Sequence, residues 1–266
     1  MTQGPFAVQL IRGNVYDYPQ YYDILFAADW KAEFRFLKAC FVKHARRRVA
    51  RLFEPACGTG RLLVKFAQAG YQVRGNDLNP RAVDYCNARF RRRGLPEPAC
   101  QGDMADFRLR GKVDAAFNTI NSFRHLGSED AAAAHLRCMA AAVAQGGIYA
   151  LGFHLTPAGP PSCDEESWSA RRGSVVVESR MWTVELHRRR REEWVRMVLD
   201  VSTPRRRFRL EDAFPFRTYT ADQFRRLLAA VPEWELSETY DFNYQIDQPV
   251  RVTRQTEDVI YVLRRR

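Results

Sequence analysis

The sequence predicts an α/β fold, a doubly wound sheet of seven mostly parallel strands with an antiparallel insertion before the last strands. From about residue 49, short apolar runs alternate with longer amphipathic stretches, which is typical of parallel strands joined by crossover helices. After Leu155 the composition changes, and Pro157 and Gly159 mark an irregular connection. The first pattern resumes with a helix that begins at Thr220. A sheet pattern that pauses and then resumes predicts one domain with an insertion.

The elements follow from this pattern in chain order. In the first half we expect strands at 49–54, 71–76, 98–101, 113–118 and 148–153, and helices at 60–69, 80–93 and 128–145. In the insertion we expect antiparallel strands at 174–186, 194–202 and 206–210. The last part should contain a helix at 220–231 and strands at 234–242 and 258–263.

The predicted domain therefore spans 1–266 and has four parts. Residues 1–48, rich in aromatic side chains, are expected to form a helical lid over the carboxyl edge of the sheet. Residues 49–155 form the ligand-binding core and 156–215 the insertion. Residues 216–266 complete the sheet.

Composition narrows the class of protein. No apolar run approaches the roughly 20 residues that span a bilayer, and the N-terminus lacks a basic start followed by an apolar stretch, so we expect a soluble cytoplasmic protein and no membrane partner. The six cysteines, Cys163 among them, include no C-x-x-C pair. We therefore expect free thiols and no metal site.

The formal net charge of +11 comes almost entirely from arginine clusters, such as Arg188–Arg191 and Arg205–Arg207. A basic balance fits either a nucleic-acid partner or a solvated surface. The clusters lack interleaved aromatic residues that could stack on bases, which favours the solvated surface. Nucleic acid is therefore a disfavoured partner, and a small molecule is the favoured one.

The segment Leu52–Leu63 carries most of the functional argument. A strand ends in Glu54 and turns through Gly58 and Gly60 into a helix, so the backbone can approach a ligand and the helix N-terminus offers free N–H donors. A dinucleotide loop would have a third glycine where this chain has Leu63, and Glu54 would repel a pyrophosphate. A ligand with an ammonium group and no phosphate suits Glu54 better.

Three further strand ends carry suitable groups. Asp77 follows the second strand, at the distance from the glycine loop where an acid can bind ribose hydroxyls. Asp103 and Met104 follow the third strand, where a carboxylate and an apolar side chain could hold an adenine ring. Asn118 ends the fourth strand. Because open α/β sheets bind ligands at these ends, we expect the groups to converge.

Here the sequence resembles a known family, the class I S-adenosylmethionine (SAM) dependent methyltransferases, over residues 48–153. E-P-A-C-G-T-G-R resembles its motif I, G-N-D-L motif II, G-D-M-A-D-F motif III and N-T-I-N-S-F-R-H-L motif IV. The insertion resembles that of sugar N-methyltransferases and relatives of glycine N-methyltransferase. The resemblance implies a Rossmann-like fold, SAM as cofactor and S-adenosylhomocysteine as product. It implies cofactor contacts from Tyr22, Glu54, Ala56, Gly58, Gly60, Asp77, Leu78, Asp103, Met104 and Asn118.

Methyl transfer to a protonated acceptor needs a base, and two histidines are candidates. His125 follows motif IV, and His154 follows the fifth strand. Both have structural alternatives, and His44, His135 and His187 look like surface positions. Motif IV lacks the N/D-P-P-Y/F stretch of enzymes that methylate nucleobase amines, which disfavours that subclass.

The insertion leaves the acceptor open. Trp168, Met181, Trp182, Trp194 and Met197 either line an apolar acceptor pocket or form the inward face of a sheet, and alternation along strands favours the second. Such insertions also form subunit contacts, so a homodimer is a further expectation. The favoured function is methyl transfer to nitrogen or oxygen of a small molecule. The alternatives are a nucleic-acid or protein methyltransferase and a non-catalytic SAM- or NAD-binding protein.

Overall fold

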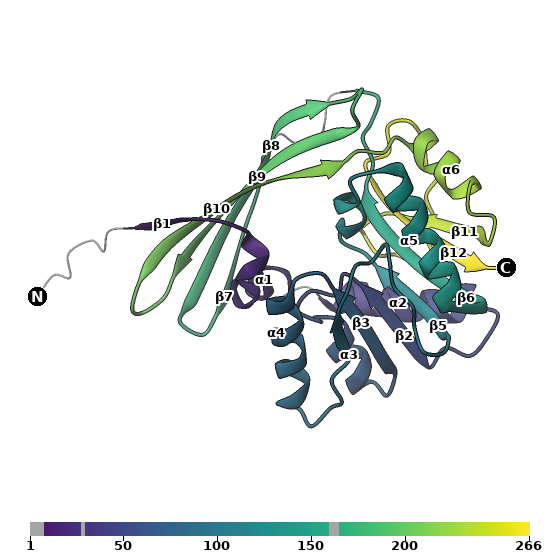
Figure 1. The fold of residues 1–266 in the computed structure, drawn as a ribbon, viewed down its shortest axis with the longest axis horizontal. Helices are drawn as coiled ribbons and strands as arrows, with labels where there is room; N and C mark the ends of the chain where they lie inside the picture. Colours follow the sequence, from purple (N-terminus) through teal and green to yellow (C-terminus); the bar gives the residue numbers. More distant parts are fainter. Residues whose placement is uncertain (1–7, 28–29, 160–164) are drawn as a thin grey trace, which may run out of the picture.

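A computed structural model describes residues 8–27, 30–159 and 165–266, which form two sheets with helices around one of them (Figure 1). The larger sheet has seven strands in the order β11-β12-β6-β5-β2-β3-β4. Its strands are β2 (Arg51–Pro55), β3 (Gln72–Asp77), β4 (Ala99–Gln101), β5 (Val113–Asn118), β6 (Val143–His154), β11 (Trp234–Tyr240) and β12 (Asp258–Arg265). This is the doubly wound sheet that the sequence predicts.

Five neighbouring strands of this sheet are parallel to one another, in the spatial order β6-β5-β2-β3-β4. Strand β12 pairs antiparallel with β6, and β11 pairs antiparallel with β12. From β2 the chain runs outward through β3 and β4, then returns to the other side of β2 with β5. The order reverses between β2 and β5, so the loops after these two strands diverge. In open α/β sheets such a reversal opens a crevice at the carboxyl ends of the strands.

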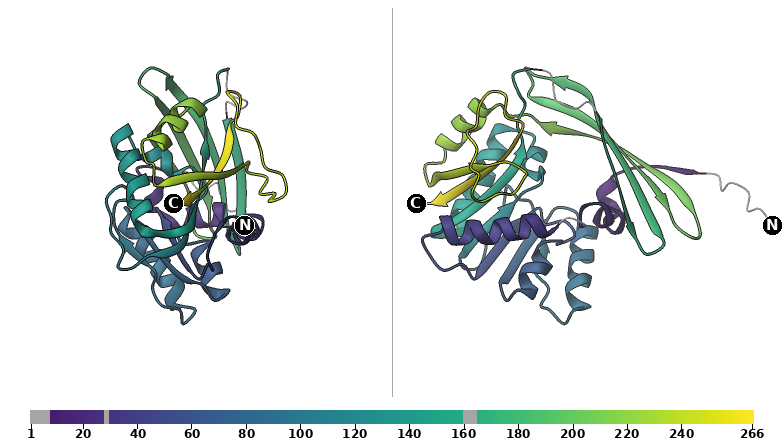
Figure 2. Two further views of the ribbon diagram at one scale, coloured as in Figure 1. Left: turned by 90° about the vertical axis from the view of Figure 1, so that its right-hand side faces the viewer. Right: turned by 180° about the vertical axis from the view of Figure 1, so that it is seen from behind.

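Helices cover both faces of the seven-stranded sheet because successive strand residues point to opposite sides. On one face, Phe53 and Ala116 pack against α5 (Glu129–Ala142) and α6 (Ala221–Ala229). On the other, Leu52 and Ala115 pack against the helices of the opposite side. These helices are α2 (Trp30–His44), α3 (Leu63–Gln68) and α4 (Pro80–Arg91). The rear view in Figure 2 shows α2 lying across this face of the sheet.

The second sheet is long and has five strands in the order β1-β10-β9-β8-β7. It projects beyond the carboxyl edge of the seven-stranded sheet, and α1 (Pro19–Phe26) lies at its base (Figure 1). The strands are β1 (Gln9–Arg12), β7 (Glu165–Arg172), β8 (Val175–His187), β9 (Glu192–Ser202) and β10 (Arg207–Arg217). Strands β7 to β10 form the antiparallel meander that the composition of the insertion predicts.

Two strands of this sheet were not expected. The N-terminal part, predicted to be helical, also contributes β1, which pairs in parallel with β10. Strand β7 has a mostly polar sequence, EESWSARR, with no clear alternation of apolar and polar residues, so the sequence pattern did not predict it. Between β1 and α1 lies a short 3₁₀ helix, η1 (Val15–Asp17), and a second one, η2 (Ser122–His125), follows β5.

The boundary between α5 and β6 also differs from the prediction. We expected the helix to reach residue 145 and to stop at Gly146 and Gly147, but α5 ends at Ala142 and β6 begins at Val143. A Cβ atom on Gly147 would lie 2.4 Å from the carbonyl oxygen of Asp114. Gly147 therefore permits close approach to the neighbouring strand rather than ending a helix.

Two histidines expected on the surface are buried. His44 lies between Ser237 and the hydroxyl of Tyr240, and His135 is fully buried. Cys163 lies outside the described residues, whereas the other cysteines are free thiols. None of the helices in the described part of the chain is long and apolar enough to cross a membrane.

Candidate active site

A cavity of about 1080 Å³ lies between the carboxyl ends of β2 to β6 and the inner face of the five-stranded sheet. Its lining includes groups from the strand ends, from the N-terminal segment and from the insertion. Predicted site residues that line it are Tyr22, Glu54, Ala56, Gly58, Asp77, Leu78, Asp103, Met104, Asn118, His125 and His154. Gly60 is the predicted residue that does not.

The two glycines of the loop after β2 have different roles. Both have positive φ, +51° at Gly58 and +63° at Gly60. A Cβ atom on Gly60 would lie 2.4 Å from Sγ of Cys86, so Gly60 allows the loop to pack against α4. A Cβ atom on Gly58 would meet nothing within 4 Å. Gly58 thus leaves open space on the cavity side, where a ligand could approach the backbone.

Glu54 is the least satisfied charge in the site. It is 8% exposed, and its Oε2 atom has no hydrogen-bond partner among the described residues. Burial raises its pKa well above the usual range, although the charge of Arg61 acts in the opposite direction. A buried carboxylate without a partner is costly, which indicates that a cationic ligand group completes this position.

Asn118 connects the two loops where the strand order reverses. Its Nδ2 atom donates to the carbonyl of Pro55 at 2.7 Å, while its Oδ1 atom is buried and has no partner within the part of the chain that the structure describes. Arg61 does not compensate Glu54 directly. It forms an ion pair with Glu33 of α2, with Nη1 and Oε2 2.5 Å apart. Glu54 and Asn118 therefore each present an unused acceptor.

Asp77 is held at the end of β3 by the backbone. Its Oδ2 atom accepts from Gly58 N at 2.7 Å and its Oδ1 atom from Asn79 N at 2.9 Å. Burial raises its pKa, and these two hydrogen bonds oppose the shift. The carboxylate is thereby fixed beside the glycine loop, with its remaining lone pairs available to hydroxyl donors.

The loop after β4 is positioned by a residue that sequence reasoning misplaced. His135 of α5 hydrogen-bonds through Nδ1 to the carbonyl oxygen of Met104 and through Nε2 to the hydroxyl of Tyr149, both at 2.9 Å. Burial lowers its pKa to about 4, so the ring is neutral near pH 7. Asp103 adds an internal bond, since its Oδ1 atom accepts from Ala105 N at 2.8 Å.

The N-terminal segment is tied to the site through Asp23 of α1, which is 1% exposed. Its carboxylate accepts a hydrogen bond from Thr59 Oγ1 at 2.8 Å and forms ion pairs with Arg89 of α4 and Arg172 of β7. Burial alone would raise the pKa of Asp23, but these partners outweigh it and the pKa is lowered. The sequence signal was only an aromatic stretch, and the long-range ion pairs could not be read from it.

Aromatic side chains from three segments form the far side of the cavity, which we call the aromatic wall. It comprises Tyr16, Tyr22, Phe26, Trp168, Phe214 and Phe216. Met181 and Met197 also line the cavity; Met197 belongs to the hydrophobic core of the inserted sheet, and Met181 packs against that core. The inward face of this sheet therefore contributes to the core and to the cavity wall. The acid Asp212 lies beside them on β10.

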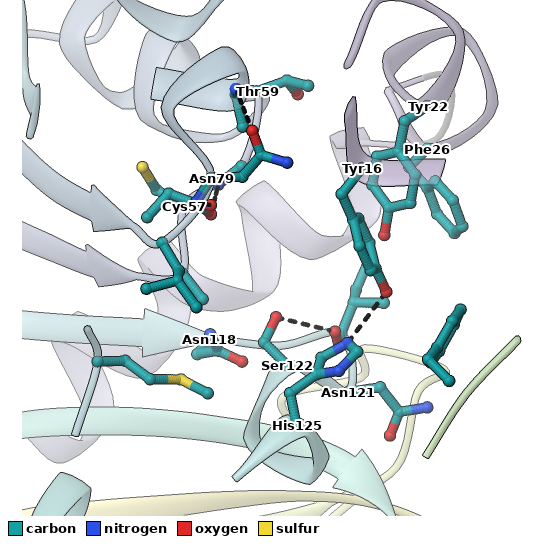
Figure 3. A pocket seen from close by; sticks show the side chains of 18 of the residues that line it. Tyr16, Tyr22, Phe26, Cys57, Thr59, Asn79, Asn118, Asn121, Ser122 and His125 are labelled. Atoms are coloured by element: carbon teal, nitrogen blue, oxygen red, sulfur yellow. Dashed lines mark hydrogen bonds between the residues drawn. The ribbon is translucent and has the colours of Figure 1, made fainter. Parts of the chain in front are cut away.

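The two candidate bases lie in different surroundings. His125 Nε2 is 3.0 Å from the hydroxyl of Tyr16, and Figure 3 shows the two side chains pointing toward each other. Burial lowers the pKa of His125 to about 4, and Arg124 adds to the effect. His154 Nδ1 lies 2.6 Å from Asp258 Oδ1. His154 also lines a smaller adjoining cavity of about 240 Å³.

The loop that carries motif IV is strained at Asn121, which has φ +55°. Asn121 Oδ1 accepts from the backbone N–H of His154 at 2.9 Å, which fixes the end of β6. The same loop also packs closely on β6 at Gly152. A side chain there would not fit, because a Cβ atom would lie 2.6 Å from the carbonyl oxygen of Thr119. Strained residues held by their surroundings often mark functional sites.

Comparison with known proteins agrees with this geometry. The family model described as a methyltransferase domain matches residues 53–147. No curated protein sequence matches the chain.

Solved structures are similar over nearly the whole chain. A SAM-dependent methyltransferase from Clostridium acetobutylicum has a TM-score of 0.75 at 16% identity, covering 94% of this chain and 99% of its own. A sugar N-methyltransferase from Streptoalloteichus has a TM-score of 0.73 at 19% identity, covering 100% and 99%. A SAM-bound amino pentose methyltransferase from Micromonospora echinaspora has a TM-score of 0.63 at 20% identity, covering 94% and 92%. Residues 53–147 thus match the family model of a methyltransferase domain, and the chain has the fold of the class I SAM-dependent methyltransferases.

Proposed function

We propose that this chain transfers a methyl group from SAM to a nitrogen or oxygen of a small-molecule acceptor. The observation that carries the proposal is the cavity of about 1080 Å³, with strand-end acids on one side and the aromatic wall on the other. Pockets of about 300 to 1000 Å³ hold one drug-sized ligand, so this volume is sufficient for a cofactor together with a small acceptor.

The residues present fit SAM. The unpartnered carboxylate of Glu54 would hold the ammonium of its amino-acid part, and Gly58 leaves room for close approach to the backbone. Asp77, fixed by two backbone N–H groups, would accept from the ribose hydroxyls. Asp103 and Met104 would hold the adenine, on a loop anchored by His135.

When bound, SAM supplies a methyl group on a sulfonium that needs no acid to leave. The chain's own residues must then align the acceptor, exclude water and, for a protonated acceptor, take up a proton. With a pKa of about 4, His125 is a weak base near neutrality and serves better to orient Tyr16. If His154 donates Nδ1–H to Asp258, Nε2 becomes the ring's proton acceptor, as in other oriented histidines.

A nucleic-acid acceptor gains no support from the distribution of arginine. Among the described residues that line the main cavity, the one arginine is Arg61, which is paired with Glu33. Arg188 lines the smaller cavity, where it donates to the carbonyl oxygens of Pro157 and Gly159. The described lining of the main cavity therefore holds no arginine cluster that could bind a phosphate backbone.

Calorimetry with SAM, S-adenosylhomocysteine and NAD tests the cofactor. We expect both SAM and its demethylated product to bind and NAD not to bind. Asp77→Ala should abolish SAM binding, whereas Asp84→Ala, which removes an acid from the neighbouring helix α4, should not. Absence of binding by SAM would refute the proposal. SAM binding without transfer of labelled methyl to any amine or hydroxyl in a broad acceptor panel would favour the non-catalytic alternative.

A further inference from the structure

We propose that the acceptor is a cationic amine that carries no phosphate or carboxylate group, and that Asp212 recognises its ammonium. This inference deepens the proposed function and rests on it. It concerns the side of the cavity away from the strand-end acids, where none of the predicted cofactor residues except Tyr22 contributes to the wall.

The charge of the cavity is opposite to that of the protein. The chain has a formal net charge of +11, yet the described residues that line the cavity include five acids and one arginine. The acids are Glu54, Asp77, Asp103, Glu166 and Asp212. Glu33 neutralises Arg61, and three of the acids are taken by the proposed cofactor site. Glu166 and Asp212 remain for the acceptor, with no lining lysine or arginine left to attract an anion.

Asp212 interrupts an otherwise apolar face of β10. Alternate residues of a strand share a face, and Phe208, Leu210, Phe214 and Phe216 share that of Asp212. Phe208 and Leu210 are buried in the core of the inserted sheet, and Phe214 and Phe216 line the cavity. The opposite face of the same strand carries Arg207, Arg209 and Arg217. The strand thus directs its arginines away from the cavity and one carboxylate into it.

The hydrogen bond that Asp212 accepts within the protein does not require a negative charge. Its Oδ2 atom accepts from the backbone N–H of Val15 at 2.9 Å, which helps to place Tyr16. An asparagine could accept the same hydrogen bond through its side-chain oxygen. The structural contact therefore leaves the charge of the carboxylate and its second oxygen available to a ligand.

The surroundings of Asp212 complete a site for an ammonium group. Aromatic faces attract cations, and here Tyr16, Phe214 and Phe216 line the same cavity as the carboxylate. A carboxylate beside several aromatic rings binds an ammonium more strongly than a neutral hydroxyl, and it repels an anion. A phosphate or carboxylate on the acceptor would meet Asp212 and Glu166 without a lysine or arginine from the described lining to compensate.

Calorimetry on the protein loaded with S-adenosylhomocysteine tests the inference with two charge series. The aromatic series is tyramine, tyrosol and 4-hydroxyphenylacetate, and the sugar series is glucosamine, glucose and glucuronate. Each series keeps its scaffold and changes the charge from positive to neutral to negative. In at least one series we expect the cation to bind at least tenfold more tightly than the neutral compound, and the anion not to bind.

Asp212→Asn should remove this preference while leaving the affinity for S-adenosylhomocysteine and the midpoint of urea unfolding unchanged. Glu211→Gln is the matched control, because it removes one negative charge from the opposite face of the same strand. The inference is wrong if neither series prefers the cation, or if the preference persists in Asp212→Asn. Failure of S-adenosylhomocysteine and SAM to bind the wild-type protein would instead overturn the proposed function.

Discussion

Replacing Glu54 by glutamine should affect cofactor binding and stability in opposite directions. The carboxylate is nearly buried, lacks a partner on Oε2 and has a pKa raised by burial. An ammonium bound here would form a charge-assisted hydrogen bond, worth about 1.5 to 3 kcal/mol. Losing it should weaken SAM binding by roughly 10-fold to 150-fold, since 1.4 kcal/mol corresponds to a factor of about ten.

The same substitution should stabilise the protein without ligand. A carboxyl group whose folded-state pKa lies above its unfolded value costs folding energy at pH above both values, and the cost disappears as the pH falls below the unfolded pKa, about 4.3. A buried polar group without a partner costs about 1 to 3 kcal/mol, so Glu54→Gln should gain on the order of 1 kcal/mol at pH 7.5. The gain should shrink as the pH falls toward 4, because wild-type Glu54 then becomes mostly protonated in the unfolded state as well.

Urea unfolding at pH 7.5 and pH 4.5, with and without SAM, measures these effects together with calorimetry at pH 7.5. Glu97→Gln is the control, because Glu97 is a surface residue whose side chain is 44% exposed and which pairs with Arg91. It should change neither quantity by more than about 0.5 kcal/mol. A Glu54→Gln protein that is less stable at pH 7.5, or that binds SAM as tightly as wild type, would refute the reasoning.

Three further predictions concern packing and protonation. Asp23→Asn leaves the buried Arg89 without its ionic partner and should lower the free energy of urea unfolding by about 3 to 5 kcal/mol; a loss under 1 kcal/mol would contradict the assigned ion pairs. Gly58→Ala should cost about 1 to 2 kcal/mol for its positive φ alone. Gly60→Ala should lower the free energy of unfolding more than Gly58→Ala, because the added Cβ atom would meet Sγ of Cys86. Adding Cys86→Ala to Gly60→Ala should recover part of this extra loss. Equal losses for the two glycine variants would exclude the contact. Burial lowers the pKa values of His125 and His135 in the folded protein to about 4, below the ordinary 6.5. As the pH falls from 6.5 to 4, each histidine should therefore lower the free energy of unfolding by up to about 3 kcal/mol. The free energy of unfolding of His135→Gln should depend less on pH than that of the wild type.

The convergence of the strand-end acids on one cavity was predictable because its geometry is local. Glu54 and Asp77 lie at the carboxyl ends of β2 and β3, Asp103 lies two residues after β4, and parallel strands bring such positions to one edge. Short-range patterns also fixed the helix that begins after Thr220, whose side chain and that of Gln223 form a capping box. Gly60 shows the limit of a motif, since the sequence cannot distinguish a glycine that admits a ligand from one that admits the neighbouring Cys86.

Buried polar residues were harder to predict, because their partners are distant in the sequence. His135 faces Met104 and Tyr149 from a helix whose first turn is polar, so periodicity alone did not reveal its burial. Strand β1 pairs with residues about 200 positions later, and its four residues have no distinctive pattern. These features depend on tertiary contacts that no window of sequence contains.

The side of the cavity away from the strand-end acids is assembled from three separate stretches of the chain. Tyr16 comes from the N-terminal segment, His125 from the loop after β5 and Asp212 from the insertion. A hydrogen bond between Tyr16 and His125 and one from Val15 N to Asp212 join them in pairs. Strand β1 also pairs with β10, so the N-terminal segment that carries Tyr16 is joined to the insertion at the strand that carries Asp212. Under the proposed function, acceptor selection would therefore depend on two segments that lie outside residues 53–147, the part matched by the methyltransferase family model. The acceptor chemistry could then change while the strand-end acids stay the same.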